Sequence, residues 1–158
     1  MDNKQIFERA LEVMTENFSH VTEMCLASSA NNVVSARDLH ACYRNGKMYV
    51  LSKIGNTLMH DIAINPNVGL CHGSHNMQGA AKSLGHPLDT QNAAIRKVMK
   101  KEFSLNYDEY VSEDNPDMRI VEITLTNAKT FTRFHRYTID FVNQTATRDH
   151  TPALFIYR

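Results

Sequence analysis

The sequence lacks the features that would tie the chain to a membrane or, through bulk charge, to nucleic acid. It contains no uninterrupted apolar run of membrane-spanning length, and Asp2 with a broken apolar pattern after it is not typical of a signal peptide. Seventeen basic residues balance seventeen acidic ones, so no overall field concentrates nucleic acid or an anionic membrane surface. We therefore expect no membrane or nucleic-acid partner, and local groups must hold any anionic ligand.

Cysteine is scarce, and its pattern does not indicate a disulfide framework. Cys25, Cys42 and Cys71 are far apart and odd in number, which favours a reducing compartment and predicts a cytoplasmic protein. All three fall in strand-like segments, where they are expected to be small core residues rather than nucleophiles. Among the eight histidines only His72 and His75 are close together, and no carboxylate or cysteine has a spacing that completes a metal site.

Familiar catalytic signatures are also missing. The sequence has no glycine-rich phosphate loop, no Gly-x-Ser-x-Gly elbow and no Cys-x-x-Cys pair. These absences argue against nucleotide hydrolysis, Rossmann-type cofactor binding and thioredoxin chemistry.

What is present is a helix followed by a series of short-range strands. Phe7, Leu11, Met14 and Phe18 recur at three- and four-residue intervals, which predicts an amphipathic helix over residues 3–18. Alternating β-branched and apolar residues, separated by Asn-Asn and Asn-Gly turns, predict hairpins. The expected strands cover residues 20–30, 33–43, 48–52, 68–71, 77–84, 118–134 and 136–142, with helices over 58–64 and 91–103 and a loop over 112–117.

These elements predict a mainly β fold in one domain. A chain of 158 residues fits a single domain. Six or seven strands with contacts of short range predict an antiparallel barrel whose openings are covered by helices. We expect a single unit over 1–158, with an N-terminal helix over 1–18, the barrel and its inserted helices over 20–142, and a C-terminal tail over 143–158.

Two features of the sequence point to an anion site. Arg37 lies in a strand among apolar neighbours, where a guanidinium needs an anion or several acceptors, although a salt bridge to Asp38 or outward exposure would also satisfy it. The segment 51–57 places a strand-end hydroxyl, a cation and a glycine before a helix N-terminus, an arrangement that can hold a phosphate. An ordinary capped helix after a turn is the alternative.

Three segments stand in a characteristic order: VVSARDLHACYRNGKMYVLSKIGNTLMHDIAINPNVGL over residues 33–70, MQGAAKSLG over 77–85 and the strand that begins MRIVEITL. In this order of elements the sequence resembles the pyridoxamine 5′-phosphate oxidase-like family of flavin-binding split barrels. The resemblance covers about residues 20–134 and implies a six- to seven-stranded antiparallel split barrel. It also implies a homodimer with flavin mononucleotide (FMN) in two clefts at the subunit interface.

The family pattern assigns cofactor contacts to particular positions. Arg37 would hold the phosphate and ribityl end of the flavin, and residues near 74–76 would face the ring. Leu51 and Ser52 would lie along the flavin, while Lys53, Asn56 and Thr57 would approach the phosphate.

Two departures from the family pattern bear on function. Many relatives carry a cation where this chain has Asn56-Thr57-Leu58, so Lys53 or Arg37 must supply the charge for the phosphate. The true oxidases carry a C-terminal tryptophan that engages the vitamin substrate, and this chain has no tryptophan. Oxidation of pyridoxamine phosphate is therefore not the expected activity.

The sequence leads to two competing functions. The first is an FMN-binding, oxidoreductase-like protein of unknown substrate, in which the flavin carries the redox chemistry. The alternative is a non-catalytic dimeric split barrel that binds haem, another flavin or no cofactor. No catalytic acid or base is assigned, because His40, His72 and His75 are equally defensible.

Overall fold

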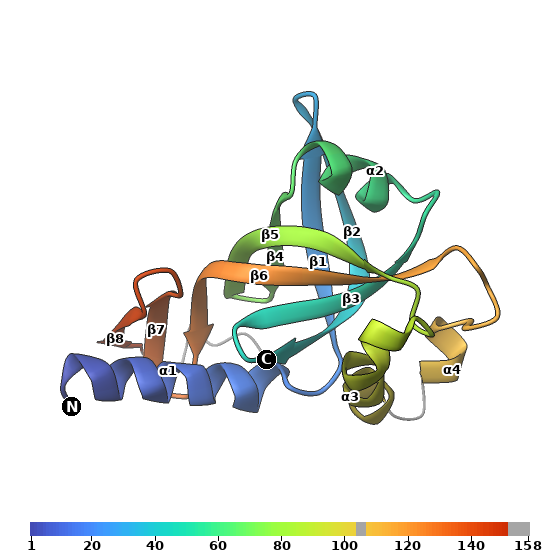
Figure 1. Ribbon diagram of the computed structural model, residues 1–158. Helices are drawn as coiled ribbons and strands as arrows, with labels where there is room; N and C mark the ends of the chain where they lie inside the picture. Colours follow the sequence, from blue (N-terminus) through green and yellow to red (C-terminus); the bar gives the residue numbers. More distant parts are fainter. Residues whose placement is uncertain (104–106, 152–158) are drawn as a thin grey trace.

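The computed structural model describes residues 1–103 and 107–151, with only the backbone described for Tyr110. Its strands form one antiparallel sheet in the order β3-β2-β1-β4-β5-β6-β7-β8 (Figure 1). The strands are β1 (Thr22–Ala30), β2 (Val33–Arg44), β3 (Lys47–Lys53), β4 (Asn67–His72), β5 (His75–Gly85), β6 (Met118–Phe131), β7 (His135–Asp140) and β8 (Thr145–His150). The helices are α1 (Asn3–Phe18), α2 (Thr57–Ile64), α3 (Ala93–Phe103) and α4 (Tyr107–Tyr110), with a 3-10 turn, η1 (Thr90–Asn92), before α3.

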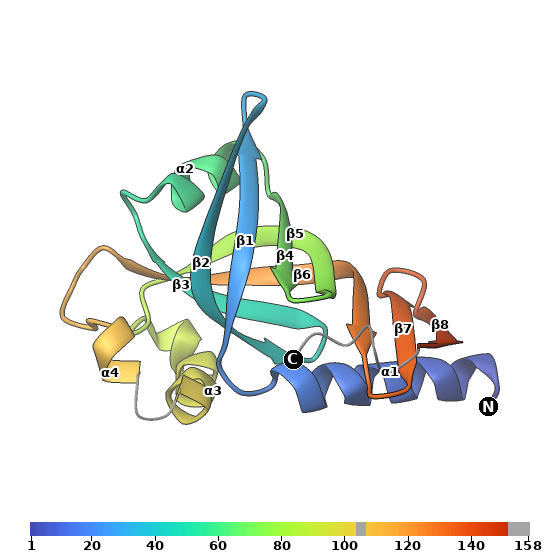
Figure 2. The ribbon, with the colours of Figure 1, turned by 180° about the vertical axis from the view of Figure 1, so that it is seen from behind.

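The first six strands form a closed barrel, because β3 pairs with β6 as well as with β2. β7 and β8 continue the sheet beyond β6, and α1 runs beneath them and beneath one end of the barrel (Figures 1 and 2). The predicted mainly β, antiparallel barrel is therefore confirmed. The segment 143–158, predicted to be a tail, instead contributes β8, and its last residues, 152–158, lie outside the described part of the chain.

Local sequence signals account for the first helix and for the two main hairpins. Asp2 and Gln5 form a reciprocal capping box that satisfies backbone N–H groups at the start of α1. Asn31 and Asn32 between β1 and β2 both adopt positive φ, and so do Asn45 and Gly46 between β2 and β3. Positive φ at both central residues is what the tight hairpin turn requires, so the predicted turns lie where expected.

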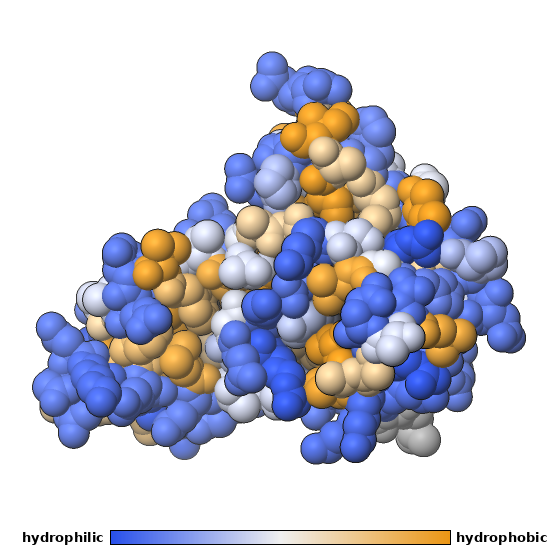
Figure 3. Space-filling model, viewed as in Figure 1, coloured by the Kyte–Doolittle hydropathy of each residue, from blue (hydrophilic) through white to orange (hydrophobic). Residues whose placement is uncertain are grey.

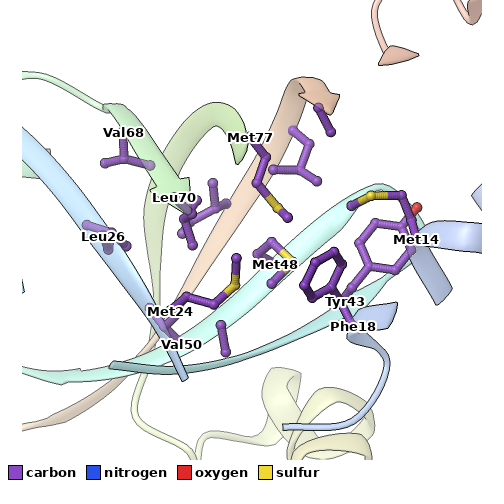
Figure 4. Packing of buried hydrophobic residues seen from close by; sticks show 14 of the residues in the cluster. Met14, Phe18, Met24, Leu26, Tyr43, Met48, Val50, Val68, Leu70 and Met77 are labelled. Carbon is purple, nitrogen blue, oxygen red and sulfur yellow. The ribbon is translucent and has the colours of Figure 1, made fainter. Parts of the chain in front are cut away.

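The interior of the barrel is rich in methionine, and α1 seals one end of it. Figure 4 shows Met14 and Phe18 of α1 facing Tyr43 and Met48 across the core. All four residues have less than 5% of their surface exposed. Methionine side chains fill irregular gaps readily, which suits an interior where helix and strands meet at different angles.

A second, smaller core lies on the outer side of the barrel beneath α3 and α4. Met99 and Phe103 of α3 pack there against Ile120 of β6. Arg96 clamps the loop after α4 through two hydrogen bonds to Glu113, at 2.6 and 2.8 Å. The loop predicted over 112–117 is found here, whereas no element was predicted for α4, because a four-residue helix is too short to show periodicity.

Candidate functional site

Strands β2 and β3 pair over only part of their length. Their register runs from Arg44 and Lys47 at the hairpin to Ala41 and Val50, and the two strands separate beyond that pair. From there β2 remains paired with β1, while β3 remains paired with β6. The barrel is therefore split between β2 and β3, and the chain crosses from β3 into α2 beside the opening.

A cleft of about 570 Å³ occupies this opening, a size within the range of about 300–1,000 Å³ that is usual for ligand pockets. One wall is the first half of β2, and the other is the end of β3 with the first turn of α2. Its lining residues are Ser35, Ala36, Arg37, Asp38, Leu39, Leu51, Ser52, Gly55, Asn56, Thr57 and Leu58. Five of the six predicted cofactor contacts, all except Lys53, thus lie on one cleft.

Arg37 is held in the cleft by a chain of polar contacts. Its Nη1 donates to the Ser28 hydroxyl at 2.8 Å and to the Leu26 carbonyl at 3.3 Å. The Ser28 hydroxyl in turn donates to Asp61 Oδ2 at 2.6 Å. Within the described part of the chain, neither Nε nor Nη2 of Arg37 has a protein acceptor, so those atoms are available to a ligand in the cleft.

Asp61, on α2, is the charge that balances Arg37. Its side chain is buried, and the hydrogen bond from Ser28 holds the pKa of its carboxyl below the ordinary value, with His60 and Arg37 adding to the effect. The carboxylate therefore stays ionised and fixes the Ser28 hydroxyl as its donor. This leaves the Ser28 oxygen to accept from Arg37, which orients the guanidinium.

Neither Ser28 nor Asp61 was predicted as a site residue from the sequence. Ser28 lies at an inward position of β1, where alternation with Met24 and Leu26 predicts an apolar residue. A buried polar residue at such a position indicates a bonded network, and this departure from the alternation is the only clue that could have been used.

The other wall of the cleft carries hydroxyl and amide groups. Ser52 is buried at the end of β3, and its Oγ accepts a hydrogen bond from Asn56 Nδ2 at 3.3 Å. Asn56 is the N-cap residue of α2, but its side chain makes no capping hydrogen bond and is turned to Ser52 instead. Thr57 follows as the first helical residue, where backbone N–H groups lack helical partners.

Lys53 does not line the cleft. Side chains alternate along a strand, so Lys53 lies on the opposite face of β3 from Ser52, and it is exposed. Of the described residues that line the cleft, Arg37 is the cationic one and Asp38 is the anionic one. The positive charge of the cleft therefore rests on Arg37.

The segment 74–76, predicted to face a flavin ring, is not among the residues that line this cleft of the single chain. His75 packs edge-on against Phe18 and Phe131, with ring centroids 5.0 and 5.4 Å away, and its Nδ1 lies 3.1 Å from Thr130 Oγ1. Burial first, and the nearby His72 second, lower the pKa of His75 from 6.5 to about 4. Among the described residues no cluster of three metal-ligating side chains occurs.

The lowered pKa of His75 predicts a pH-dependent stability. Between pH 6.5 and about 4 the unfolded chain binds a proton at His75 that the folded chain does not, so stability falls as the pH falls. After allowance for partial exposure, we expect a loss of about 1–3 kcal/mol of unfolding free energy across this window.

Urea unfolding at successive pH values measures this loss. His75→Asn should flatten the profile in that window, whereas His20→Asn, at an exposed histidine, should leave it unchanged. An unaltered slope in the His75 variant would contradict the assignment.

Another cavity, of about 610 Å³, lies between α1 and the β2–β3 turn. Phe7, Leu11, Tyr43 and Phe141 give it apolar walls, and none of the predicted cofactor contacts lines it. The cleft between β2 and α2 is therefore the candidate site.

Comparison with solved structures relates this architecture to known proteins. General stress protein 26 from Bacillus anthracis str. Sterne matches with a TM-score of 0.60 at 14% identity, over 76% of this chain and 92% of that chain. A protein related to general stress protein 26, of the pyridoxinephosphate oxidase family, from Clostridium acetobutylicum matches with a TM-score of 0.58 at 10% identity. The match covers 90% of this chain and 99% of that chain. An FAD-binding protein from Mesorhizobium loti matches with a TM-score of 0.58 at 17% identity, over 77% of this chain and 90% of that chain.

No protein-family model and no curated protein sequence matches the chain. None of the described helices has both the length and the apolar character needed to cross a membrane. With a barrel of six antiparallel strands that opens between β2 and β3, the chain has the split-barrel fold of the pyridoxamine 5′-phosphate oxidase-like proteins, as the resemblance predicted.

Proposed function

We propose that the cleft between β2 and α2 binds the phosphate and ribityl end of FMN, and that the chain is an oxidoreductase-like flavoprotein. The observation that carries this proposal is the convergence of Arg37, Ser52, Asn56 and Thr57 on one cleft from three separate elements. The fold is shared with a structure described as FAD-binding, which supports a flavin-type cofactor.

The donor set of the cleft fits a phosphate ester with a polyol chain. Arg37 offers Nε and Nη2 to the phosphate, in the charge-assisted contact that guanidinium groups make with phosphate oxygens. The N-terminal turn of α2 adds backbone N–H groups and a favourable dipole. Ser52 and Asn56 present hydroxyl and amide groups for the ribityl hydroxyls. The bound flavin would supply the two-electron chemistry, and the protein would orient it.

We infer that two copies of the chain complete the site. Large apolar side chains are exposed around this end of the molecule: Val33 and Val34 at the β1–β2 hairpin by 65% and 71%, Ile54 before α2 by 49%, and Ile64 at its end by 51%. Figure 3 shows apolar surface gathered over the hairpin and α2. Exposed apolar residues grouped beside a cleft are typical of an interaction surface. A second subunit there would cover them and enclose the flavin ring.

The direct test of the proposal is titration of the purified protein with FMN and with riboflavin, followed by flavin fluorescence. Riboflavin lacks the phosphate, so a site of this design should bind FMN more tightly. Failure to bind any flavin, in a preparation that shows no flavin absorbance, would refute the proposed function.

Arg37→Ala is the sharpest test within the site. Loss of a charge-assisted contact to the phosphate should cost about 1.5–3 kcal/mol of FMN affinity, roughly tenfold or more, and should change riboflavin affinity little. Arg133→Ala serves as the matched control, since it removes the same charge from an exposed position outside the cleft.

Lys53→Ala tests the second predicted cation, and its position outside the lining predicts a smaller loss than that of Arg37→Ala. Identical FMN titration curves for wild type, Arg37→Ala and Lys53→Ala would contradict the proposal that the FMN phosphate binds in this cleft.

A non-catalytic binding module is the second candidate, and one observation favours it. Asp38 lines the cleft, and Asp61 lies behind Ser28, so two carboxylates offset the single cationic side chain. A phosphate would be held less strongly there than at a site with several cations. A colourless dimer that is unchanged by added flavin would support this candidate.

A further inference from the structure

Cys25 and Cys71 face each other across neighbouring strands, although they lie far apart in the sequence. The antiparallel register of β1 and β4 pairs Cys25 directly with Cys71. Their neighbours Leu26 and Leu70 are also paired and point into the core, so both thiols lie on the outer face of the barrel. Figures 1 and 2 both show β1 and β4 side by side.

The geometry of this pair is that of two residues a disulfide can join. Directly opposed residues of antiparallel strands have Cα atoms about 4.5–5.5 Å apart, inside the range of about 4.4–6.8 Å that disulfides span. The two side chains are near enough for Cys25 to contribute to the raised pKa of the Cys71 thiol. Cys71 is exposed and Cys25 is partly exposed, so a small reagent can reach the pair.

We propose that Cys25 and Cys71 form a redox-active thiol pair that closes to an intrachain disulfide when it meets a low-molecular-weight disulfide. The exposed Cys71 thiolate attacks the reagent, forms a mixed disulfide and releases one thiolate. Cys25, as a thiolate, then attacks Cys71 Sγ, forms the Cys25–Cys71 bond and releases the second thiolate. The pair gives up two electrons and two protons, and the reagent is reduced to two thiols.

The surroundings of the two thiols determine the rate at which the disulfide forms. Partial desolvation of the thiol first, then Cys25, then Asp38 on β2, raise the pKa of the Cys71 thiol. The thiolate is the attacking species, so closure should be slow at neutral pH and should accelerate as the pH rises. Slow closure would make the pair respond to sustained oxidation rather than to brief exposure.

The bond would enclose the candidate cleft in a covalent loop. The segment between Cys25 and Cys71 contains most of β1, all of β2, β3 and α2, and hence every residue that lines the cleft. Asp38, which opposes Cys25 on β2, is one of those residues. Oxidation would therefore tie together the part of the barrel that carries the site, whether or not that site binds a flavin.

The experiment treats the full chain with oxidised glutathione across a pH series, blocks the remaining thiols and measures the intact mass. We expect the loss of two hydrogen atoms, a peptide that links Cys25 to Cys71 after digestion without reductant, and a higher unfolding temperature that dithiothreitol reverses. Cys25→Ser should stop at the mixed disulfide and keep one glutathionyl group on Cys71.

Cys42→Ser is the matched control, because Cys42 is buried, its pKa is raised to about 12 by that burial, and it lies outside the pair. The Cys42→Ser variant should form the Cys25–Cys71 disulfide as the wild type does. Separate glutathionyl groups on Cys25 and Cys71, a disulfide between chains, or two free thiols after alkaline treatment would each overturn the proposal.

Discussion

Phe18→Ala should destabilise the protein by about 3–5 kcal/mol, the cost usual for truncating a fully buried phenylalanine. Phe18 is 1% exposed and ends α1, where it joins the helix to the barrel. Figure 4 shows its ring beside Tyr43 and Met14 at the closed end of the core. The truncation would leave a cavity that the surrounding strands, held by their ladders, cannot collapse to fill.

Thermal and urea unfolding measure this effect, and the midpoint of thermal unfolding should fall by roughly 10 °C for a chain of this length. Phe134→Ala is the control, because Phe134 is 50% exposed and its loss should change stability by no more than about 0.5 kcal/mol. Equal effects of the two truncations would show that α1 is not packed as described.

The same variant has a second readout at His75. The Phe18 ring lies edge-on to His75, with centroids 5.0 Å apart, and helps to exclude water from the imidazole. In Phe18→Ala the pKa of His75 should rise toward its ordinary value, because the burial that lowers it is relieved. The acid-side loss of stability should then be smaller than in the wild type, which a general loss of packing would not produce.

Short-range signals in the sequence were sufficient for most of the fold. The capping residue Asp2, the Asn-Asn and Asn-Gly turns and the alternation along β2 each act within a few residues, and each lies where it was predicted. β8 was missed because TATRDH has no apolar alternation, and its strand character comes from its pairing with β7. Edge strands of this kind are defined by a neighbour rather than by their own residues.

Only those residues of the candidate site that are unusual among their sequence neighbours were predictable. Arg37 and the segment 51–57 are unusual in their own contexts, and the split between β2 and β3 brings them to one cleft. Asp61 and Ser28 gave no such signal, because their role depends on α2 packing over β1. The Cys25–Cys71 pair was hidden for the same reason, since only the β1–β4 register brings the thiols together.

Gly79 is unfavourable for a strand when judged from the sequence but is required by the packing of the structure. In the sequence it weakens the strand prediction over 77–84, because glycine is unfavourable inside a strand. In the structure it lies at a register shift between β5 and β6, where the two backbones approach closely. A Cβ built at Gly79 would lie 2.5 Å from the Thr124 carbonyl oxygen and 2.9 Å from Ile123 Cγ2. The glycine is therefore what allows these strands to pair.

Gly79→Ala should consequently destabilise the protein by about 3 kcal/mol, at the upper end of the usual cost of overpacking. The obstructing oxygen belongs to the backbone, so relief requires β5 and β6 to move apart, and β6 is also the strand that closes the barrel against β3. The unfolding free energy from urea titration measures the loss.

Two other glycines provide matched controls for this substitution. A Cβ at Gly69 on β4 would meet only the Met77 carbonyl oxygen at 3.9 Å, and a Cβ at Gly55 would meet nothing within 4 Å. Alanine at either position should be neutral or slightly stabilising, because it lowers the entropy of the unfolded chain. A loss in Gly69→Ala as large as that in Gly79→Ala would mean that strand propensity, rather than the close approach of β5 to β6, determines the cost.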